Sequence, residues 1–351
     1  MIKVRIADPG DLKLWDNYVR NRFDATPYHL SAWNTSINAA YGHQTFNLIA
    51  ESDKYICGVL PLCIIKPPLL TGTLCSLPYC DLAGILADNK ETRTRLLNKA
   101  LGVSRDLGIH YLTIRERSSN EYDVISNTEN MKNHKVSMML DLPETSDILL
   151  KTFKSKLRSQ IKKAEKNGLT FRYGREDCYL KGFYNVFSQN MKNLGSPTHS
   201  YSWFEEIRRH YSNDIIIGIV NIGDKVVAGG ILLTLNNITV VPWASTLASY
   251  NRLSPNMLLY WNFLKYACDR GCKQFDFGRS SYGEGTYKFK QQWGAKPIPL
   301  SWKKYDSTGS VLTNEITSYF SLRPIAESIW RRLPLVLANS IGPLARKYIS
   351  L

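Results

Sequence analysis

The sequence FDFGRSSYGEGTYKFKQQWG, residues 275–294, carries more information than any other part of the chain. The pattern predicts a short strand over 274–277, a glycine-rich turn, and then a helix with aromatic and cationic side chains. A helix that begins after such a turn points unpaired backbone N–H groups at the space in front of it. This stretch therefore predicts a binding site for an anion.

The chain has 351 residues, of which 44% are hydrophobic and 21% charged, enough for two ordinary domains with a core in each. Its formal net charge is +15. Such a charge favours anionic partners, which include diphosphates, nucleic acid and anionic membrane surfaces.

Several classes of protein are disfavoured by what the sequence lacks. The first residues have no apolar signal-peptide core, and no apolar run approaches the roughly 20 residues that span a bilayer. The seven cysteines are irregularly spaced, as in a cytosolic protein with reduced thiols, and the six histidines are not at metal-ligand spacing. We therefore expect a cytoplasmic protein without a metal.

The predicted elements follow the same order twice: a strand, two helices, an antiparallel meander, a helix and a strand. Gly223-Asp224 and Asn236-Asn237 predict tight hairpins in the second copy. We interpret this order as a tandem duplication of one α/β (α+β) unit with a mixed, mostly antiparallel sheet flanked by helices. The expected domains are 1–143 and 144–306, with a helical tail over 307–351.

A strongly basic helix is expected over 147–167. Its apolar residues recur every three or four positions, so one stripe packs inward and the other face carries seven cations against two acids. A merely solvated face is the alternative. Because unpaired cations repel one another, an anion is expected to complete the face.

Other candidate groups lie around the opening motif. Asp276 and Arg279 flank Phe277-Gly278 at a strand end, where either a structural pairing or catalysis is expected. Lys290 lies about one turn into the next helix and could stabilise an oxyanion or a phosphate. The helix over 178–194 ends with Asn190, Lys192 and Asn193, which could line a binding site.

The tail mixes aliphatic residues with Arg331, Arg332 and Arg346, and its prolines prevent one long helix. A C-terminal helix packed on the domains is the plainer interpretation. The alternative is an interfacial anchor with Trp330 and cations at the headgroup level.

The chain resembles the FemAB-like proteins associated with PEP-CTERM/exosortase exopolysaccharide systems. In the C-terminal half the resemblance is carried by KLRSQIKKA (156–164), NMKNLGSP (190–197), DFGRS (276–280) and FKQQWG (289–294). In the N-terminal half it is carried by HLSAW (29–33), GVLPL (58–62) and SLPY (76–79). The resemblance implies tandem GNAT-like domains and transfer of an aminoacyl or acyl group to an amine of a cell-envelope or exopolysaccharide precursor.

The resemblance also implies roles for particular residues. Phe289 and Lys290 match a Phe-Lys pair that serves the reacting ester, so Lys290 is expected to be catalytic, with Asp276 as a second candidate that accepts the ammonium proton. The candidate substrate-binding residues are Arg158, Lys162, Lys163, Asn190, Arg279, Ser280, Tyr282, Lys288 and Phe289.

The resemblance implies no permanently bound cofactor, an acyl-CoA or aminoacyl-tRNA donor, and a diphosphate- or nucleotide-bearing acceptor. The loop over 246–255 departs from it, because it lacks the glycine-rich pyrophosphate loop of ordinary acetyl-CoA enzymes. An acyl-CoA-dependent sugar N-acyltransferase and a non-catalytic, membrane-peripheral glycan-assembly module are the alternatives. Sequence-independent RNA binding also fits the charge, and the tail allows peripheral contact with the inner membrane face.

Overall fold

The computed structural model describes residues 1–117, 135–312 and 323–350. By their internal contacts the residues form two compact units, neither of which is one continuous piece of chain. Unit 1 contains Met1–Ser119, Leu300–Phe320 and Leu344–Leu351. Unit 2 contains Asn120–Pro299 and Ser321–Pro343.

The sheet of unit 1 has the strand order β1-β2-β3-β4-β6-β13, and β5 pairs with β3 on one side. Only β4 and β6 are parallel among these pairs. The strands are β1 (Lys3–Ile6), β2 (Thr45–Ser52), β3 (Tyr55–Ile65), β4 (Thr73–Cys75), β5 (Leu86–Ala87), β6 (Tyr111–Arg117) and β13 (Lys296–Asp306), of which β13 contributes Leu300–Asp306 here.

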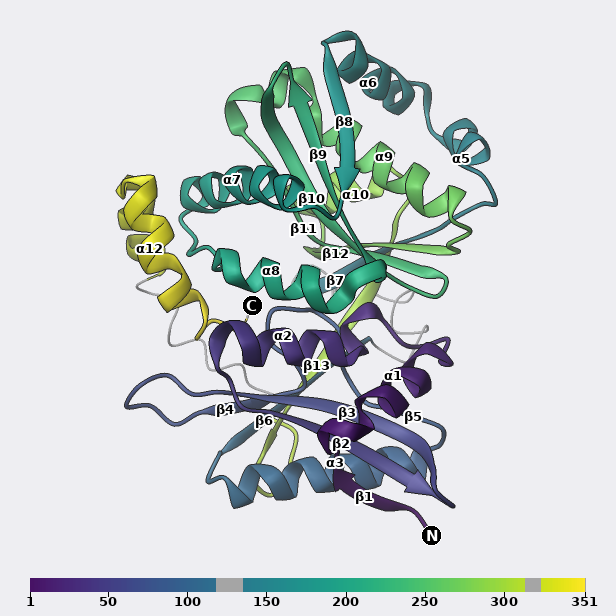
Figure 1. The fold of residues 1–351 in the computed structure, drawn as a ribbon, viewed down its shortest axis with the longest axis vertical. Coiled ribbons are helices and arrows are strands. Elements are labelled where there is room, and N and C mark those ends of the chain that lie inside the picture. Colours follow the sequence, from purple (N-terminus) through teal and green to yellow (C-terminus); the bar gives the residue numbers. More distant parts are fainter. Residues whose placement is uncertain (118–134, 313–322, 351) are drawn as a thin grey trace. The chain divides into compact units, whose positions relative to one another are not determined.

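The helices of this unit are α1 (Leu12–Arg20), α2 (Ser31–Tyr41) and α3 (Lys90–Asp106). Figure 1 shows α3 on one face of the sheet and α1 and α2 on the other. Leu96 of α3 is fully buried against Leu48, Leu60 and Leu112 of the strands, so the apolar stripe of the helix closes the core.

The sheet of unit 2 has the order β13-β7-β12-β11-β10-β9-β8. Here β11 and β12 form the parallel pair, and the other pairs are antiparallel. The strands are β7 (Lys135–Asp141), β8 (Leu169–Gly174), β9 (Ile215–Ile222), β10 (Lys225–Leu235), β11 (Ile238–Thr246) and β12 (Gln274–Ser281). The predicted hairpin turns at Gly223-Asp224 and Asn236-Asn237 are confirmed.

Helices cover both faces of this second sheet. They are α5 (Ser146–Thr152), α6 (Ser155–Lys166), α7 (Asp177–Leu194), α8 (Tyr201–Tyr211), α9 (Pro255–Asp269) and α10 (Gly285–Gln291). Successive residues of a strand point to opposite faces. A Cβ on Gly229 would meet the backbone of Phe183 in α7, and one on Gly230 would meet the ring of Phe263 in α9. Glycine at these two positions therefore lets α7 and α9 pack closely on opposite faces of β10.

Apart from the two-residue strand β5 of unit 1, both units repeat one order. Unit 1 runs β1-α1-α2-β2-β3-β4-α3-β6, and unit 2 runs β8-α7-α8-β9-β10-β11-α9-β12. The predicted tandem arrangement of mixed α/β units is confirmed. One feature is not visible in the sequence: β7, which follows β6 in the chain, pairs with β12, and most of β13, which follows β12, pairs with β6.

Two local predictions were wrong. The basic segment forms two helices instead of one, because Phe153 and Lys154 take extended backbone conformations between α5 and α6. The strand that opens the sequence motif extends to Ser281 and does not end at Phe277, because Gly278 is accommodated within β12. The apolar stripe is confirmed, since Leu157, Ile161 and Ala164 of α6 are buried.

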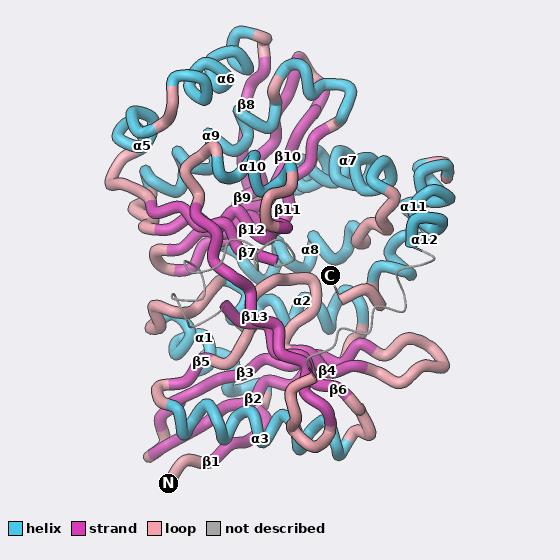
Figure 2. The backbone as a smooth tube through the Cα atoms, turned by 180° about the vertical axis from the view of Figure 1, so that it is seen from behind, coloured by secondary structure: helices cyan, strands magenta, loops and turns pink. Residues whose placement is uncertain are grey.

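The tail contains α11 (Arg323–Arg332) and α12 (Leu335–Arg346). Figure 2 shows these helices next to α7, and Arg331 donates a hydrogen bond to the carbonyl of Leu194 at the end of α7. Among the residues that the structure describes, no helix is both long and apolar enough to cross a bilayer.

Candidate active site in unit 2

The site is built where two parallel strands separate. β11 pairs with β12 only from Ile238 to Val240, opposite Gln274 to Asp276. Beyond that point β11 stays paired with β10 and β12 with β7. Ligands of α/β proteins commonly bind at the carboxyl ends of strands that part in this way.

Gly278 makes a bulge in β12 at the point of separation. The register shifts between Asp276, opposite Met139, and Arg279, opposite Ser137, so one extra residue is accommodated on β12. Gly278 has φ +76°, a conformation that residues with a Cβ rarely adopt.

Asp276 holds this bulge in place. Its Oδ1 accepts a hydrogen bond of 2.7 Å from the backbone N–H of Gly278 and one of 2.8 Å from the hydroxyl of Ser137. Only 2% of Asp276 is exposed. A buried carboxylate needs such donors, and here they tie the bulge to the neighbouring strand.

Lys290 reaches the bulge from α10. Its ammonium Nζ donates hydrogen bonds to the carbonyl oxygens of Gly278, at 2.9 Å, and Arg279, at 2.8 Å. The residue is 7% exposed. The two carbonyl dipoles fix a positive charge beside the separating strands, and a charge fixed in a water-poor site stabilises developing negative charge more strongly than one in water.

Several other predicted residues lie around this centre. Arg279 and Ser280 follow the bulge, and the buried Ser280 Oγ has no hydrogen-bond partner among the described residues. Tyr282 lies in the turn before α10 with its ring 4.8 Å from that of Tyr287. Across the gap, the half-buried Asn190 of α7 donates to Ser245 Oγ on β11 at 3.2 Å.

Two predicted residues of α10 point elsewhere. Lys288 is exposed, away from the buried face of the helix that carries Tyr287 and Lys290. Phe289 packs on Tyr260 and Trp293, with centroid distances of 5.1 Å and 6.3 Å. Their assignment to substrate binding stays a prediction.

The predicted cations Arg158, Lys162 and Lys163 lie on α6. All three are exposed and have no ion pair with another described residue. No hydrogen bond joins them to the β12–α10 residues. The structure thus groups the predicted residues into a buried centre at β12 and α10 and a separate exposed basic face on α6.

The loop after β11 folds differently from a glycine-rich phosphate loop. Residues Ala248–Leu253 form a 3₁₀ helix, and Leu253 accepts a hydrogen bond from the side chain of Asn167. Lys225 lies 5.1 Å from the ring centre of Tyr250 in the same loop. These contacts hold the loop in place. The sequence likewise lacks the glycines of a pyrophosphate-binding loop here.

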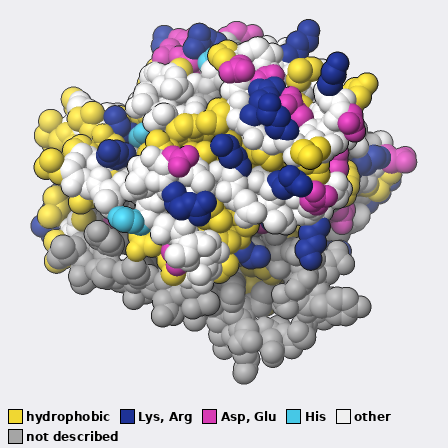
Figure 3. Space-filling model, turned by 90° about the horizontal axis from the view of Figure 1, so that it is seen from below, with side chains coloured by type: hydrophobic (Ala, Val, Ile, Leu, Met, Phe, Trp, Pro, Cys, Tyr) yellow, Lys and Arg dark blue, Asp and Glu magenta, His cyan; other side chains and the backbone are white. Residues whose placement is uncertain are grey.

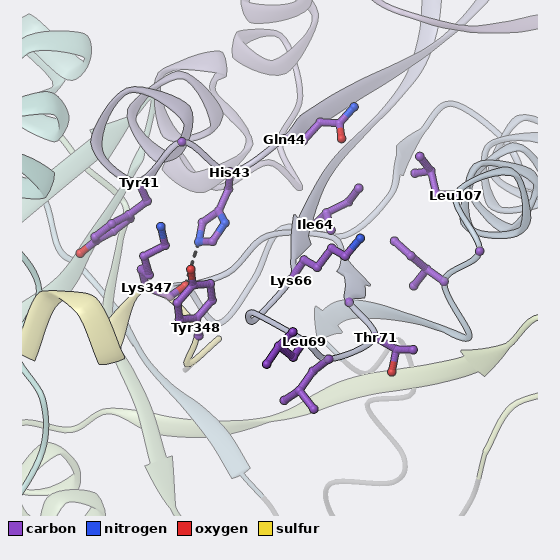
Figure 4. Close-up of a pocket in the computed structure, with 15 residues that line it drawn as sticks. Tyr41, His43, Gln44, Ile64, Lys66, Leu69, Thr71, Leu107, Lys347 and Tyr348 are labelled. Carbon is purple, nitrogen blue, oxygen red and sulfur yellow. Dashed lines mark hydrogen bonds between the residues drawn. The ribbon is translucent and has the colours of Figure 1, made fainter.

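A cavity of about 610 Å³ lies in unit 1, where none of the predicted site residues is found. Figure 4 shows His43 directed at the backbone of Lys347, whose carbonyl accepts from His43 Nε2 at 2.8 Å and from the Tyr79 hydroxyl at 2.6 Å. Burial lowers the pKa of His43. These bonds anchor the segment after α12 to unit 1.

Among the described residues, no group of three or more His, Cys, Asp or Glu side chains is placed to hold a metal ion. Sequence reasoning missed Ser137 and Ser245, since nothing in the chain indicates that these serines face Asp276 and Asn190. Gly278 was visible in the motif, but its position inside a strand was not.

Comparisons with known proteins bear on the fold that carries this site. Residues 151–291 match the acetyltransferase (GNAT) domain family. No curated protein matches the chain.

Solved structures show the same fold at low sequence identity. A crystal structure of FemX aligns with a TM-score of 0.68 and 16% identity, covering 93% of this chain and 100% of that one. A tandem GNAT protein from the clavulanic acid biosynthesis pathway gives 0.54 and 9%, covering 88% and 100%. L-PGS from Bacillus licheniformis gives 0.55 and 11%, covering 99% and 98%. The chain thus has a tandem GNAT fold, and the matched domain includes β11, β12 and α10.

Proposed function

We propose that this protein transfers an aminoacyl or acyl group to an amine, with the reacting carbonyl held where β11 and β12 separate in unit 2. The observation that carries the proposal is the ammonium of Lys290, fixed on the carbonyls of Gly278 and Arg279 inside a domain that matches acetyltransferases. Acyl transfer creates an oxyanion, and a preorganised cation lowers its energy.

In the proposed reaction a neutral amine attacks the carbonyl carbon of an ester or thioester. The new C–N bond forms while the carbonyl oxygen becomes an oxyanion, which the positive charge of Lys290 stabilises. The carbon–oxygen or carbon–sulfur bond then breaks, and the proton lost by the amine nitrogen leaves with the hydroxyl or thiol. No oxidant or reductant is needed.

Asp276 fits a positioning role better than proton transfer. Its Oδ1 is occupied by the Gly278 N–H and the Ser137 hydroxyl, and the side chain is buried. Through these bonds it holds the bulge whose carbonyls receive Lys290. The sequence predicted Asp276 as the acceptor of the ammonium proton. We propose instead that Asp276 shapes the site.

The donor and acceptor are proposed from charge and family resemblance. The exposed cations Arg158, Lys162 and Lys163 would attract a phosphate-bearing substrate, either a diphosphate-carrying envelope precursor or the tRNA of an aminoacyl donor. The 3₁₀ helix after β11 supports aminoacyl-tRNA over acyl-CoA, because ordinary acetyl-CoA enzymes carry a glycine-rich loop at this place. The exopolysaccharide setting rests on the sequence resemblance alone.

Mass spectrometry of small molecules and RNA that co-purify with the full-length protein tests the donor. We expect an aminoacylated tRNA. A bound CoA species would instead indicate an acyl-CoA-dependent N-acyltransferase. Purified protein is then mixed with each donor and an amino-sugar nucleotide. Donor consumption that does not depend on an amine acceptor would contradict amine acylation.

A second candidate function is a membrane-peripheral module for glycan assembly without catalysis. It is favoured by the tail, in which large aliphatic side chains are exposed on both helices: Ile325, Ile329, Leu335, Val336, Leu337 and Ile341. Figure 3 shows hydrophobic side chains gathered at the left edge of the face drawn, with cations among them. A protein that binds vesicles but consumes neither donor would favour this function.

A further inference from the structure

A cavity that the proposed reaction does not use lies in unit 2, between the end of β7, helices α5 and α6, and the residues that follow α10. Its volume is about 610 Å³, within the range that holds small organic ligands. It is lined by residues from two stretches that are far apart in the sequence, 140–160 and 291–294, so it is a product of the tertiary fold.

The floor of this cavity is apolar and buried. Phe153 and Trp293 meet edge to face with centroids 5.5 Å apart, and Leu149 and Leu157 complete the floor. All four are buried, with Trp293 only 1% exposed. Phe153 lies in the extended link between α5 and α6, so the break between the two helices places its ring here. Such a floor suits an alkyl or aryl group.

Two polar atoms of the lining are buried without partners. These are Nε1 of Trp293, a donor, and Oε1 of Gln160, an acceptor; neither has a hydrogen bond to another described residue. Buried polar groups are nearly always paired, so these two atoms, next to the cavity, are exceptions within the described part of the chain.

The rim is positively charged. Lys154 and Lys156 line the cavity at the start of α6, and no side chain caps the N-terminus of that helix. Asp141 is the one carboxylate of the lining, and it accepts a long hydrogen bond of 3.5 Å from Gln274. Two cations and a helix N-terminus outweigh one acid, so the rim attracts an anion.

We propose that this cavity binds a single-chain amphipathic anion, an alkyl phosphate or carboxylate, with its chain on the Phe153–Trp293 floor and its anionic group at Lys154, Lys156 and the start of α6. The proposal does not depend on acyl transfer, because neither Asp276 nor Lys290 lines the cavity. The backbone N–H of Trp293 donates to the carbonyl of Lys290 at 3.1 Å, a bond that leaves the Lys290 ammonium on its own two carbonyls.

The test follows the indole N–H signals of the full-length protein by NMR, with Trp293→Phe identifying the signal of Trp293. Octyl phosphate below its micellar concentration should move that signal in a saturable way. Octyltrimethylammonium and inorganic phosphate at the same concentration should not, because each lacks one half of the required chemistry. An unmoved Trp293 signal, or equal binding of the cationic detergent, would overturn the proposal.

Matched charge variants sharpen the result. Lys154→Gln with Lys156→Gln should weaken octyl phosphate binding about fivefold and reduce its dependence on salt. Lys151→Gln with Lys166→Gln removes the same charge from exposed positions of α5 and α6 outside the lining, and it should leave the affinity unchanged. Equal weakening by both pairs would show that only the overall charge matters, and would contradict a built site.

Discussion

The ammonium of Lys290 donates a hydrogen bond of 2.9 Å to the carbonyl oxygen of Gly278, the residue whose positive φ makes the bulge in β12. The backbone N–H of the same glycine is bound by Asp276. One residue thus links the carboxylate on β12 to the cation on α10. Substitution of either side chain is therefore expected to alter the bulge. Only substitution of Lys290 also removes the positive charge, so the two roles can be told apart.

Asp276 is expected to position the bulge. Asp276→Asn keeps an acceptor oxygen for Gly278 and Ser137, so kcat should stay within about tenfold of wild type, whereas Asp276→Ala should lower it by about 10². Both variants are compared in the donor-consumption assay after their folding is checked by thermal unfolding. A loss in Asp276→Asn as large as that in Asp276→Ala would show that the negative charge itself is required, as expected of a proton acceptor.

The basic face of α6 is expected to bind the phosphate-bearing substrate. Lys162→Glu with Lys163→Glu should raise KM with little change in kcat, and the effect should shrink as salt screens the charges. Lys13→Glu with Lys99→Glu makes the same change in net charge at exposed positions of unit 1 and serves as the control. Equal effects of the two pairs, or an effect independent of salt, would contradict substrate binding by α6. Its basic face would then be an ordinary solvated surface.

His29 should make the protein less stable in mild acid. Burial lowers its pKa to about 4, and its Nδ1 accepts from the backbone N–H of Thr26, which requires a neutral ring. The unfolded chain binds a proton near pH 6.5, so the free energy of unfolding should fall as pH drops from about 6.5 to about 4, by roughly 3 kcal/mol in total. Below about pH 4 this contribution should stop changing.

Urea unfolding between pH 4.5 and 7.5 measures this dependence. His29→Asn keeps an acceptor near the Nδ1 position and should reduce the slope by about 1.4 kcal/mol per pH unit within that window. An unchanged slope would mean that His29 binds its proton at the same pH in the folded and the unfolded protein.

The tail is expected to bind anionic membranes. Ile329 and Ile341 are exposed on α11 and α12, and the cations Arg331 and Arg332 lie close by. Wild-type protein should float with phosphatidylglycerol vesicles, and Ile329→Glu with Ile341→Glu should abolish flotation. Leu14→Glu with Tyr55→Glu, which alters two exposed apolar residues of unit 1, is the control. If the doubly substituted protein still floats, the tail is not the part that binds membranes. Its exposed apolar residues would then be assigned to contact with a protein partner.

The repeated order of elements could be predicted because it depends on local signals. Alternating apolar residues, the Gly223-Asp224 and Asn236-Asn237 turns and the helical stripe of Leu157, Ile161 and Ala164 each act over a few residues. The motif over 275–294 likewise indicated that Lys290 would lie on a helix directly after a strand, which the structure confirms.

Other features depend on contacts between residues that are far apart in the sequence, which local signals do not predict. The pairing of β7 with β12 and of β13 with β6 is decided by tertiary contacts, because either strand could equally pair within its own half. The break at Phe153 is set by packing of its ring on Trp261 and Trp293, against the helical propensity of the segment. The bond from Ser137 to Asp276 joins residues 139 positions apart.

The central claim is that the charge of Lys290 stabilises the reacting oxyanion, and the turnover number of Lys290→Met tests it most directly. We expect kcat to fall by about 10² or more at a temperature where the variant is fully folded, while Lys265→Met, an exposed lysine of α9, keeps wild-type turnover. A folded Lys290→Met protein with wild-type kcat would remove Lys290 from the chemistry and contradict the account.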